Sequence, residues 1–194
     1  MAHIAATAIV FPGVELGEGS VIEDYCIIGC PPRGRNPGEL ATRIGRNALI
    51  RAFTVVYAGN RIGDDFQSGN KANIREENEI GNSVSVGTLS VVEHHVRIGD
   101  GVRIHTQAFI PEFSVLADRC WVGPNVVLTN AKFPNRPDTK ASLAGPVIEE
   151  EAVLGANCTV LPGVRVGARA LVGAGSVVTR SVEAGRVVKG NPAR

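Results

Sequence analysis

The feature that most constrains the fold of this chain is a branched aliphatic residue at every sixth position. These anchors run from Ile4 to Ile28, from Ile44 to Leu128 and from Ile148 to Val178, and only Ser68 departs from the type. An amphipathic α-helix repeats its buried face every 3.6 residues, and a half-buried strand repeats it every two. A period of six fits neither, and it indicates one side of a triangular coil.

Three such units make a turn of eighteen residues, and successive turns stack as parallel strands about 4.8 Å apart. Residues eighteen apart are therefore expected to be vertical neighbours. Glycine often follows the anchor, as expected where the chain turns tight corners. Four positions after the anchor the side chain is small or apolar, as at Val102, Ala108, Ser114, Cys120, Val126, Cys158 and Ser176. The pattern predicts an all-β parallel β-helix of eight or nine triangular coils.

Two segments interrupt the repeat, and both are rich in proline and polar residues. They comprise residues 30–43 and 130–146, and we expect each to leave the coil as an extruded loop. Residues 183–194 form a short closing segment, so the chain 1–194 is predicted to be a single domain. Long loops on a rigid scaffold often carry function. For the second loop, a tolerated insertion remains the alternative.

Charge and hydropathy restrict the classes of partner that this chain is expected to bind. The formal net charge is +1, which provides no long-range field to attract nucleic acid or an anionic membrane. The first residues lack a basic segment followed by an apolar stretch, and no run reaches the length of a membrane span. We therefore expect a soluble, cytoplasmic protein. The four cysteines form no CxxC zinc pattern, and we interpret them as reduced packing thiols.

Histidine is the natural general base near neutral pH, and the chain contains four. The eighteen-residue rule places Glu76 one coil below His94 and Glu112 one coil above it. A carboxylate that reached the ring would fix its tautomer. A general base and a surface histidine in a charged ladder both remain open for His94.

His105 follows an anchor where glycine is common. Its vertical neighbours are Gly87 and Gly123, which leaves room for a ligand beside the ring. His105 and Gln107 are therefore candidates for contacts with an acceptor or an acyl group. The alternative is that His105 and Gln107 are polar residues at a corner of the coil and have no functional role.

The repeat resembles the [LIV]-G-x4 units of the hexapeptide-repeat acyltransferases, and the resemblance covers nearly the whole chain. Residues 92–100 (VEHHVRIGD) are similar to the base-bearing segment of bacterial nucleotide-sugar N-acetyltransferases, I-E-H-[ED]-x-x-I-G-[DE]. The resemblance implies a left-handed coil, a homotrimer with sites between subunits, and His94 as the base. His95 stands where that family has an orienting acid. The orienting role would therefore fall to Glu76 or Glu112, and His95 is interpreted as solvent-exposed.

The same resemblance implies acetyl-coenzyme A as cosubstrate, held at corners of the C-terminal coils. Ala156 and Ala174 occupy such corners, and Arg180 and Lys189 are candidates for the coenzyme phosphates or, alternatively, solvated surface charges. Residues 123–130 (GPNVVLTN) match the word G-P-x-x-x-x-T-N of the nucleotide-sugar enzymes. Together with a looser match at Arg136, this makes Asn130 and Arg136 candidates for binding the acceptor. No metal is expected.

These observations favour an acyl-coenzyme A-dependent enzyme that N-acetylates an amino sugar, and the resemblance favours a nucleotide-linked one. O-acetylation of a hydroxyl is the alternative within the enzyme class. A non-catalytic β-helix that binds a small ligand or a protein is the alternative outside it. An amine needs less help than a hydroxyl, so His94 could prove dispensable. The acceptor sugar, its nucleotide and the acyl group are left open.

Overall fold

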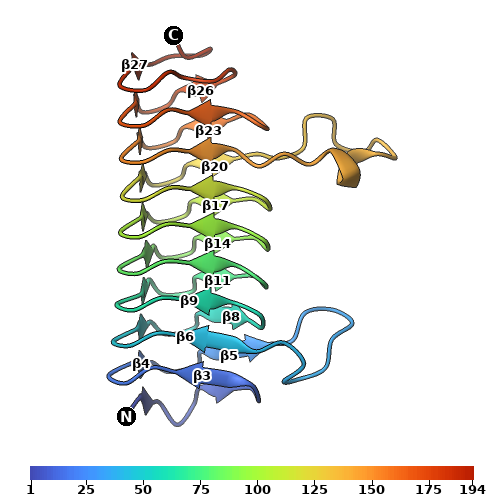
Figure 1. Cartoon of the computed structure of the whole chain (residues 1–194), viewed down its shortest axis with the longest axis vertical. Helices are drawn as coiled ribbons and strands as arrows, with labels where there is room; N and C mark the ends of the chain where they lie inside the picture. Colours follow the sequence, from blue (N-terminus) through green and yellow to red (C-terminus); the bar gives the residue numbers. More distant parts are fainter.

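The computed structural model describes all residues 1–194 and is a parallel β-solenoid (Figure 1). Its strands are short, most of them two residues long, and they form three parallel sheets, one on each side of the triangular coil. The only helix is a single 3₁₀ turn, η1 (Thr139–Ser142). No helix is long and apolar enough to cross a membrane. The predicted all-β coil is confirmed.

The chain visits the three sheets in rotation, and we name them A, B and C. Sheet A contains β1 (His3–Ile4), β4 (Val21–Ile22), β7 (Leu49–Ile50), β10 (Gln67–Ser68), β13 (Ser85–Val86), β16 (Arg103–Ile104), β19 (Trp121–Val122), β22 (Val153–Leu154), β25 (Leu171–Val172) and β27 (Val187–Val188). Sheet B contains β2 (Ile9–Val10), β5 (Ile27–Cys30), β8 (Val55–Tyr57), β11 (Asn73–Ile74), β14 (Val91–Val92), β17 (Phe109–Ile110), β20 (Val127–Leu128), β23 (Thr159–Val160) and β26 (Val177–Val178). Sheet C contains β3 (Val14–Leu16), β6 (Thr42–Ile44), β9 (Arg61–Ile62), β12 (Glu79–Ile80), β15 (Arg97–Ile98), β18 (Val115–Leu116), β21 (Val147–Ile148) and β24 (Arg165–Val166).

The strand register follows the eighteen-residue rule. Asn73 pairs with Val91, and Val91 pairs with Phe109. Across the second loop the same stacking continues, because Val115 pairs with Val147 despite the longer stretch of sequence between them. Sheets A, B and C hold ten, nine and eight strands, close to the predicted eight or nine coils. The tenth strand of sheet A is β27, which the closing segment contributes.

The anchors and the small residues four positions later together fill the interior. Ile74, Val92 and Ile110 are 0% exposed, and all of the small positions named above are buried. Ser68, the one polar anchor, accepts a hydrogen bond from the backbone N–H of Arg51 at 2.9 Å and pairs with the Thr54 hydroxyl at 3.1 Å. A buried hydroxyl with partners costs little, so the exception is tolerated.

The glycine after each anchor has a different physical reason from the expected one. The left-handed backbone conformation falls two positions further on, on residues such as His95 (φ 57°) and Phe113 (φ 64°). At Gly87 an added Cβ would lie 2.4 Å from the backbone N of Thr106 in the next coil. Glycine is required there because stacked corners approach closely, and tolerance of a positive φ plays no part.

All four cysteines are free thiols, and three of them lie fully inside the prism. Burial raises the pKa of Cys120 to about 12 and also raises the pKa of the half-buried Cys30. Because the thiolate is the nucleophile, the native protein should react slowly with iodoacetamide, first at Cys30. Mass spectrometry of the labelled native and unfolded protein tests this order. Early labelling of Cys120 in the native state would contradict it.

Candidate functional site

Both extruded loops leave the same edge of the prism, the corner column between sheets B and C (Figure 1). The first loop follows β5 and the second follows β20. We call this column the B–C edge. Its coils between the two loops carry a dense group of charged and aromatic side chains, so the loops border one stretch of the edge from below and above.

Buried asparagines hold the backbone of this edge in place. The Asn60 amide donates to the carbonyls of Tyr57 and Arg75, each at 2.7 Å. The Asn78 amide also donates to the Arg75 carbonyl, at 2.8 Å, and its Oδ1 accepts the Val96 N–H at 2.7 Å. Both side chains are fully enclosed. A satisfied buried network of this kind is rigid, and it supports the corner from which the candidate base projects.

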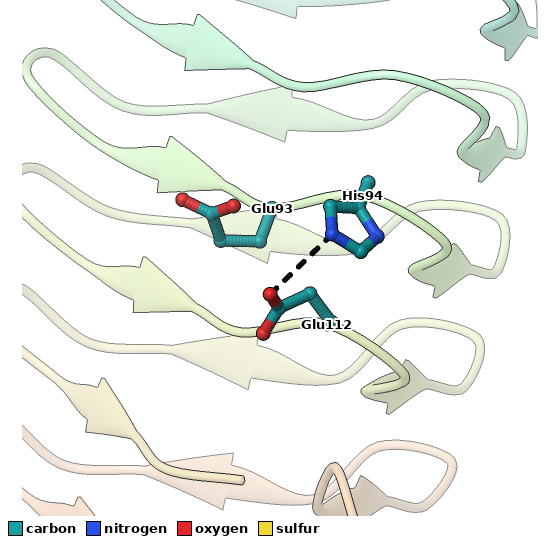
Figure 2. Close-up of side chains that lie close together, drawn as sticks. All are labelled: Glu93, His94 and Glu112. Carbon is teal, nitrogen blue, oxygen red and sulfur yellow. Dashed lines mark ion pairs between the residues drawn. The ribbon is translucent and has the colours of Figure 1, made fainter. Parts of the chain in front are cut away.

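His94 lies on this edge, and Glu112 lies beside it on the next coil toward the C-terminus, as the register predicts. Its Nε2 is 3.4 Å from Glu112 Oε1, and both side chains are about three-quarters buried, at 28% and 25% exposure. Figure 2 shows this pair with Glu93, which precedes His94 on the same coil. The arrangement places a carboxylate where it would stabilise a positively charged imidazole.

Glu76 lies below His94, as the register predicts, but its hydrogen bonds go elsewhere. Arg75 Nε and Nη2 donate to the two oxygens of Glu76 at 2.8 and 2.9 Å. Burial is the largest single influence and would raise the pKa of Glu76, but the hydrogen bonds from Arg75, a backbone hydrogen bond and the nearby positive charge together outweigh it, so the pKa is lowered. Glu76 is therefore engaged by Arg75, and Glu112 is the carboxylate in contact with the ring.

The ionised Glu76 contributes stability that depends on pH. Because its folded pKa is depressed, the contribution is present above the unfolded value of about 4.3 and is lost as the pH falls through the folded value. We expect the wild type to exceed Glu76→Gln in free energy of unfolding at neutral pH, and the gap to shrink below about pH 4.3. Urea denaturation of both proteins from pH 7 to pH 3 measures it. A gap independent of pH would contradict the assignment.

The ligand atoms of Glu93, His94 and Glu112 all lie within 4.8 Å of one another, a spacing at which three groups could hold a divalent cation. Both carboxylates already have partners in the protein, however. Arg75 Nη1 is 3.2 Å from Glu93 Oε2, and Asn130 Nδ2 donates to Glu112 Oε2 at 2.5 Å. These contacts account for the cluster as an ion-pair network.

Asn130 links this cluster to the second loop. It is the first residue of the loop, its side chain holds Glu112, and its carbonyl accepts the N–H of Ala144 at 2.9 Å, which closes the base of the loop. Further out, the guanidinium of Arg136 lies 4.2 Å from the ring centroid of Phe133. Of the two predicted acceptor-binding residues in this loop, Asn130 thus reaches the His94 cluster through Glu112, and Arg136 packs within the loop itself.

His95 is exposed, as the sequence interpretation expected, but it also contacts the candidate base, which that interpretation did not anticipate. Its side chain is half exposed, but its Nδ1 is 2.8 Å from Nδ1 of His94, and its Nε2 is 3.6 Å from Glu77 Oε2. The Phe113 ring packs against both imidazoles, with centroid distances of 6.2 and 5.9 Å. The one available signal was the histidine at a position where the family has an acid.

A cavity of about 380 Å³ opens beside this histidine pair. Its lining includes His95, Phe113, Glu77 and Arg97. A wider, open groove of about 670 Å³ continues from there along sheet C. The candidate base therefore lies next to a surface hollow with room for a small acceptor.

His105 and Gln107 lie on a different edge, between sheets A and B. The His105 ring packs against Trp121 at a centroid distance of 4.5 Å, and its Nε2 is buried without a hydrogen-bond partner. A Cβ at Gly87 would meet the next coil's backbone, so the glycine lets the coils stack closely. An open groove of about 270 Å³, lined by both Gly87 and His105, lies at the place where room for a ligand was expected.

The predicted coenzyme contacts are divided between these two edges. Ala156 and Ala174 stack on the A–B edge, where the Ala156 carbonyl accepts the Gly175 N–H at 2.8 Å. Lys189 lies on the same edge, close to Gly173. Arg180 belongs to the B–C edge and lines a cavity of about 360 Å³ with other basic residues of the closing segment. One chain therefore presents His94 and the two alanines on different edges.

Comparison with known proteins agrees with this fold. Residues 147–180 match the family described as the hexapeptide repeat of succinyl-transferase. A curated relative, the bifunctional protein GlmU of Heliobacterium modesticaldum, is 30% identical over 184 residues, which cover 95% of this chain and 37% of the relative. The chain spans 36–37% of the length of the first curated relatives that it matches.

Two solved structures are similar to this chain over its whole length. LpxA from Acinetobacter baumannii aligns over 100% of this chain and 70% of its own, with a TM-score of 0.50 and 16% identity. The acetyltransferase domain of PglB from Neisseria gonorrhoeae, solved in complex with acetyl coenzyme A, aligns over 100% of this chain and 56% of its own. Its TM-score is 0.46 and its identity 16%. At 16% identity, the match to LpxA bears on the fold alone.

Proposed function

We propose, from the confirmed resemblance to the hexapeptide-repeat acyltransferases, that this chain transfers an acyl group from acyl-coenzyme A to a small acceptor. The proposed cosubstrate is acetyl-coenzyme A, and the proposed acceptor is the amine of an amino sugar, linked to a nucleotide. The observation that carries the proposal is the position of His94: an imidazole against Glu112, beside a surface cavity and between two extruded loops.

The chemistry requires one proton to move from acceptor to leaving group. The acceptor amine attacks the thioester carbonyl, and His94 takes the proton that the nitrogen loses as the new C–N bond forms. Glu112 stabilises the resulting imidazolium. The C–S bond then breaks, and the coenzyme leaves as a thiolate that recovers the proton from His94. Backbone N–H groups supply the donors for the transient oxyanion.

The division of the candidate residues between two edges supports a site shared by subunits. A base on the B–C edge and coenzyme contacts at Ala156 and Ala174 on the A–B edge can meet when one edge of a protomer faces the other edge of its neighbour. A cyclic assembly brings unlike edges together in this way. We therefore propose a homotrimer with acetyl-coenzyme A held between neighbouring protomers.

The test is the release of free coenzyme thiol from acetyl-coenzyme A, measured against matched acceptors. The panel contains nucleotide-linked amino sugars, the corresponding hydroxy sugars and the free sugars. We expect release with the amino sugars and little with their hydroxy counterparts. Release with hydroxy sugars alone would replace the proposal by O-acetylation. Absence of both release and coenzyme binding would favour the non-catalytic scaffold.

A further inference from the structure

His94 has a neighbour at each of its two ring nitrogens. Nε2 faces Glu112 at 3.4 Å, and Nδ1 faces Nδ1 of His95 at 2.8 Å. His95 in turn faces Glu77 through its own Nε2, at 3.6 Å. The four side chains thus form a row from Glu112 through the two imidazoles to Glu77, and the row crosses from the base to the cavity beside it.

Counting protons limits what this row can do. A nitrogen-to-nitrogen hydrogen bond holds one proton, and two neutral imidazoles carry two protons between them. One proton therefore lies between the two Nδ1 atoms, and the other lies on the Nε2 of either His94 or His95. In the first arrangement His94 donates to Glu112. In the second, the Nε2 proton of His95 points toward Glu77 at 3.6 Å, and His94 donates its Nδ1 proton to His95.

The partners of the two carboxylates distinguish these arrangements. Glu112 already accepts a hydrogen bond from Asn130 at 2.5 Å, so it has a donor without His94. Glu77 has no side-chain hydrogen bond, and His95 is its only ion-pair partner. The second arrangement therefore gives each of the two carboxylates a donor from the protein, whereas the first leaves the half-exposed Glu77 to solvent alone.

We propose that Glu77 and His95 orient His94, so that His94 Nδ1 donates to His95 and His94 Nε2 is left free as the proton-accepting atom. In this row, His95 is a positioning residue that replaces the acid found at its place in the resembling segment. The inference rests on the proposed function for its catalytic consequence. The hydrogen-bond arrangement that it assigns is argued from these four side chains alone and does not depend on that function.

The surroundings suit this role. Glu112 lies beside the free Nε2 and stabilises the charge that forms when the base accepts a proton. The other two carboxylates on this edge, Glu76 and Glu93, are both paired with Arg75, which offsets their charge. The Phe113 ring packs across both imidazoles and restricts their rotation.

Two substitutions at position 95 distinguish the effect of the hydrogen bond to His94 from the effect of the side chain's shape. His95→Phe keeps a ring and removes both nitrogens, and His95→Asn places an amide oxygen close to the position of Nδ1. Both residue types occupy the same left-handed corner conformation elsewhere in the chain, at Phe113 (φ 64°) and Asn125 (φ 56°), so both variants should fold. The pair is therefore a matched test of the acceptor atom.

We expect His95→Phe to lower kcat about 10- to 100-fold with KM nearly unchanged, a part of the roughly 10²- to 10⁴-fold that a general base supplies. His95→Asn should recover most of that loss. Glu77→Gln keeps an acceptor oxygen and should shift the pH profile of kcat with a smaller loss. Equal losses in His95→Phe and His95→Asn would overturn the inference.

The tautomer is measured independently of any activity. Long-range ¹H–¹⁵N correlation spectra of the full chain, labelled at histidine, should show His94 protonated at Nδ1 at neutral pH, and His95→Phe should abolish that preference. A proton on Nε2 of His94 would overturn the inference even in an active enzyme. If no acceptor is turned over while His94 carries its proton on Nδ1, the proposed function fails and the orienting row stands.

Discussion

Replacing His94 by alanine is expected to lower thiol release from acetyl-coenzyme A by about 10²- to 10⁴-fold, with little change in KM for the coenzyme. The reason is that His94 is the imidazole in contact with the carboxylate of Glu112, and its neighbour His95 lines the cavity beside the B–C edge. The alanine leaves the fold intact because the side chain is outside the prism. Initial rates at saturating acetyl-coenzyme A with the preferred amino-sugar acceptor measure the effect.

The matched control is His3→Ala, an exposed histidine on the first coil, which should leave the rate unchanged. A His94→Ala variant that retains nearly full activity would remove His94 from the chemistry. The rate of His105→Ala would then show whether the base lies on the A–B edge. If that variant too is fully active, the amine loses its proton to solvent.

The second large effect is structural: Gly87→Ala is expected to reduce the free energy of unfolding by about 3 kcal/mol. The new methyl group would lie 2.4 Å from the backbone N of Thr106 and 2.5 Å from the carbonyl carbon of His105. Two stacked coils would have to separate locally, because the obstructing atoms are backbone. Urea denaturation followed by circular dichroism measures the change.

The control is Gly173→Ala, at the equivalent corner near the C-terminal end. There the nearest atom to an added Cβ is Lys189 Cβ at 3.0 Å, and the nearest backbone atom is at 3.5 Å. This variant should lose no more than about 1 kcal/mol, since a small displacement relieves the contact. Similar losses in both variants would show that the local backbone preference of glycine, and not coil stacking, sets the cost of replacing these residues.

Most of the fold follows from the period of six, because burial is decided by the repeat. The anchor at Ile74 and its vertical neighbours Val56 and Val92 are all enclosed, and each was identified by counting alone. The role of the glycines was harder to infer. Sequence shows where glycine recurs, but the clash of a Cβ with the next coil depends on the actual distance between corners.

The candidate site was predictable only as a set of vertical neighbours. Counting placed Glu76 and Glu112 below and above His94, but it could not show that Arg75, the residue adjacent to Glu76, binds that carboxylate. It also could not give the direction of His95. His95 has a left-handed backbone conformation and an exposed side chain, and its Nδ1 nevertheless lies 2.8 Å from Nδ1 of His94, a contact that counting residues does not reveal.

The coils keep their stacking across both loops, apart from one irregularity between Ile28 and Cys30 where the first loop begins, so the stacking does not depend on what the loops contain. Val14 pairs with Thr42 and Val115 with Val147 as directly as any neighbours without an insertion between them. A loop can therefore lengthen, shorten or be exchanged between relatives while every coil keeps its place. Selection for a new acceptor could therefore change the two loops without changing the stability of the β-solenoid from which they extend.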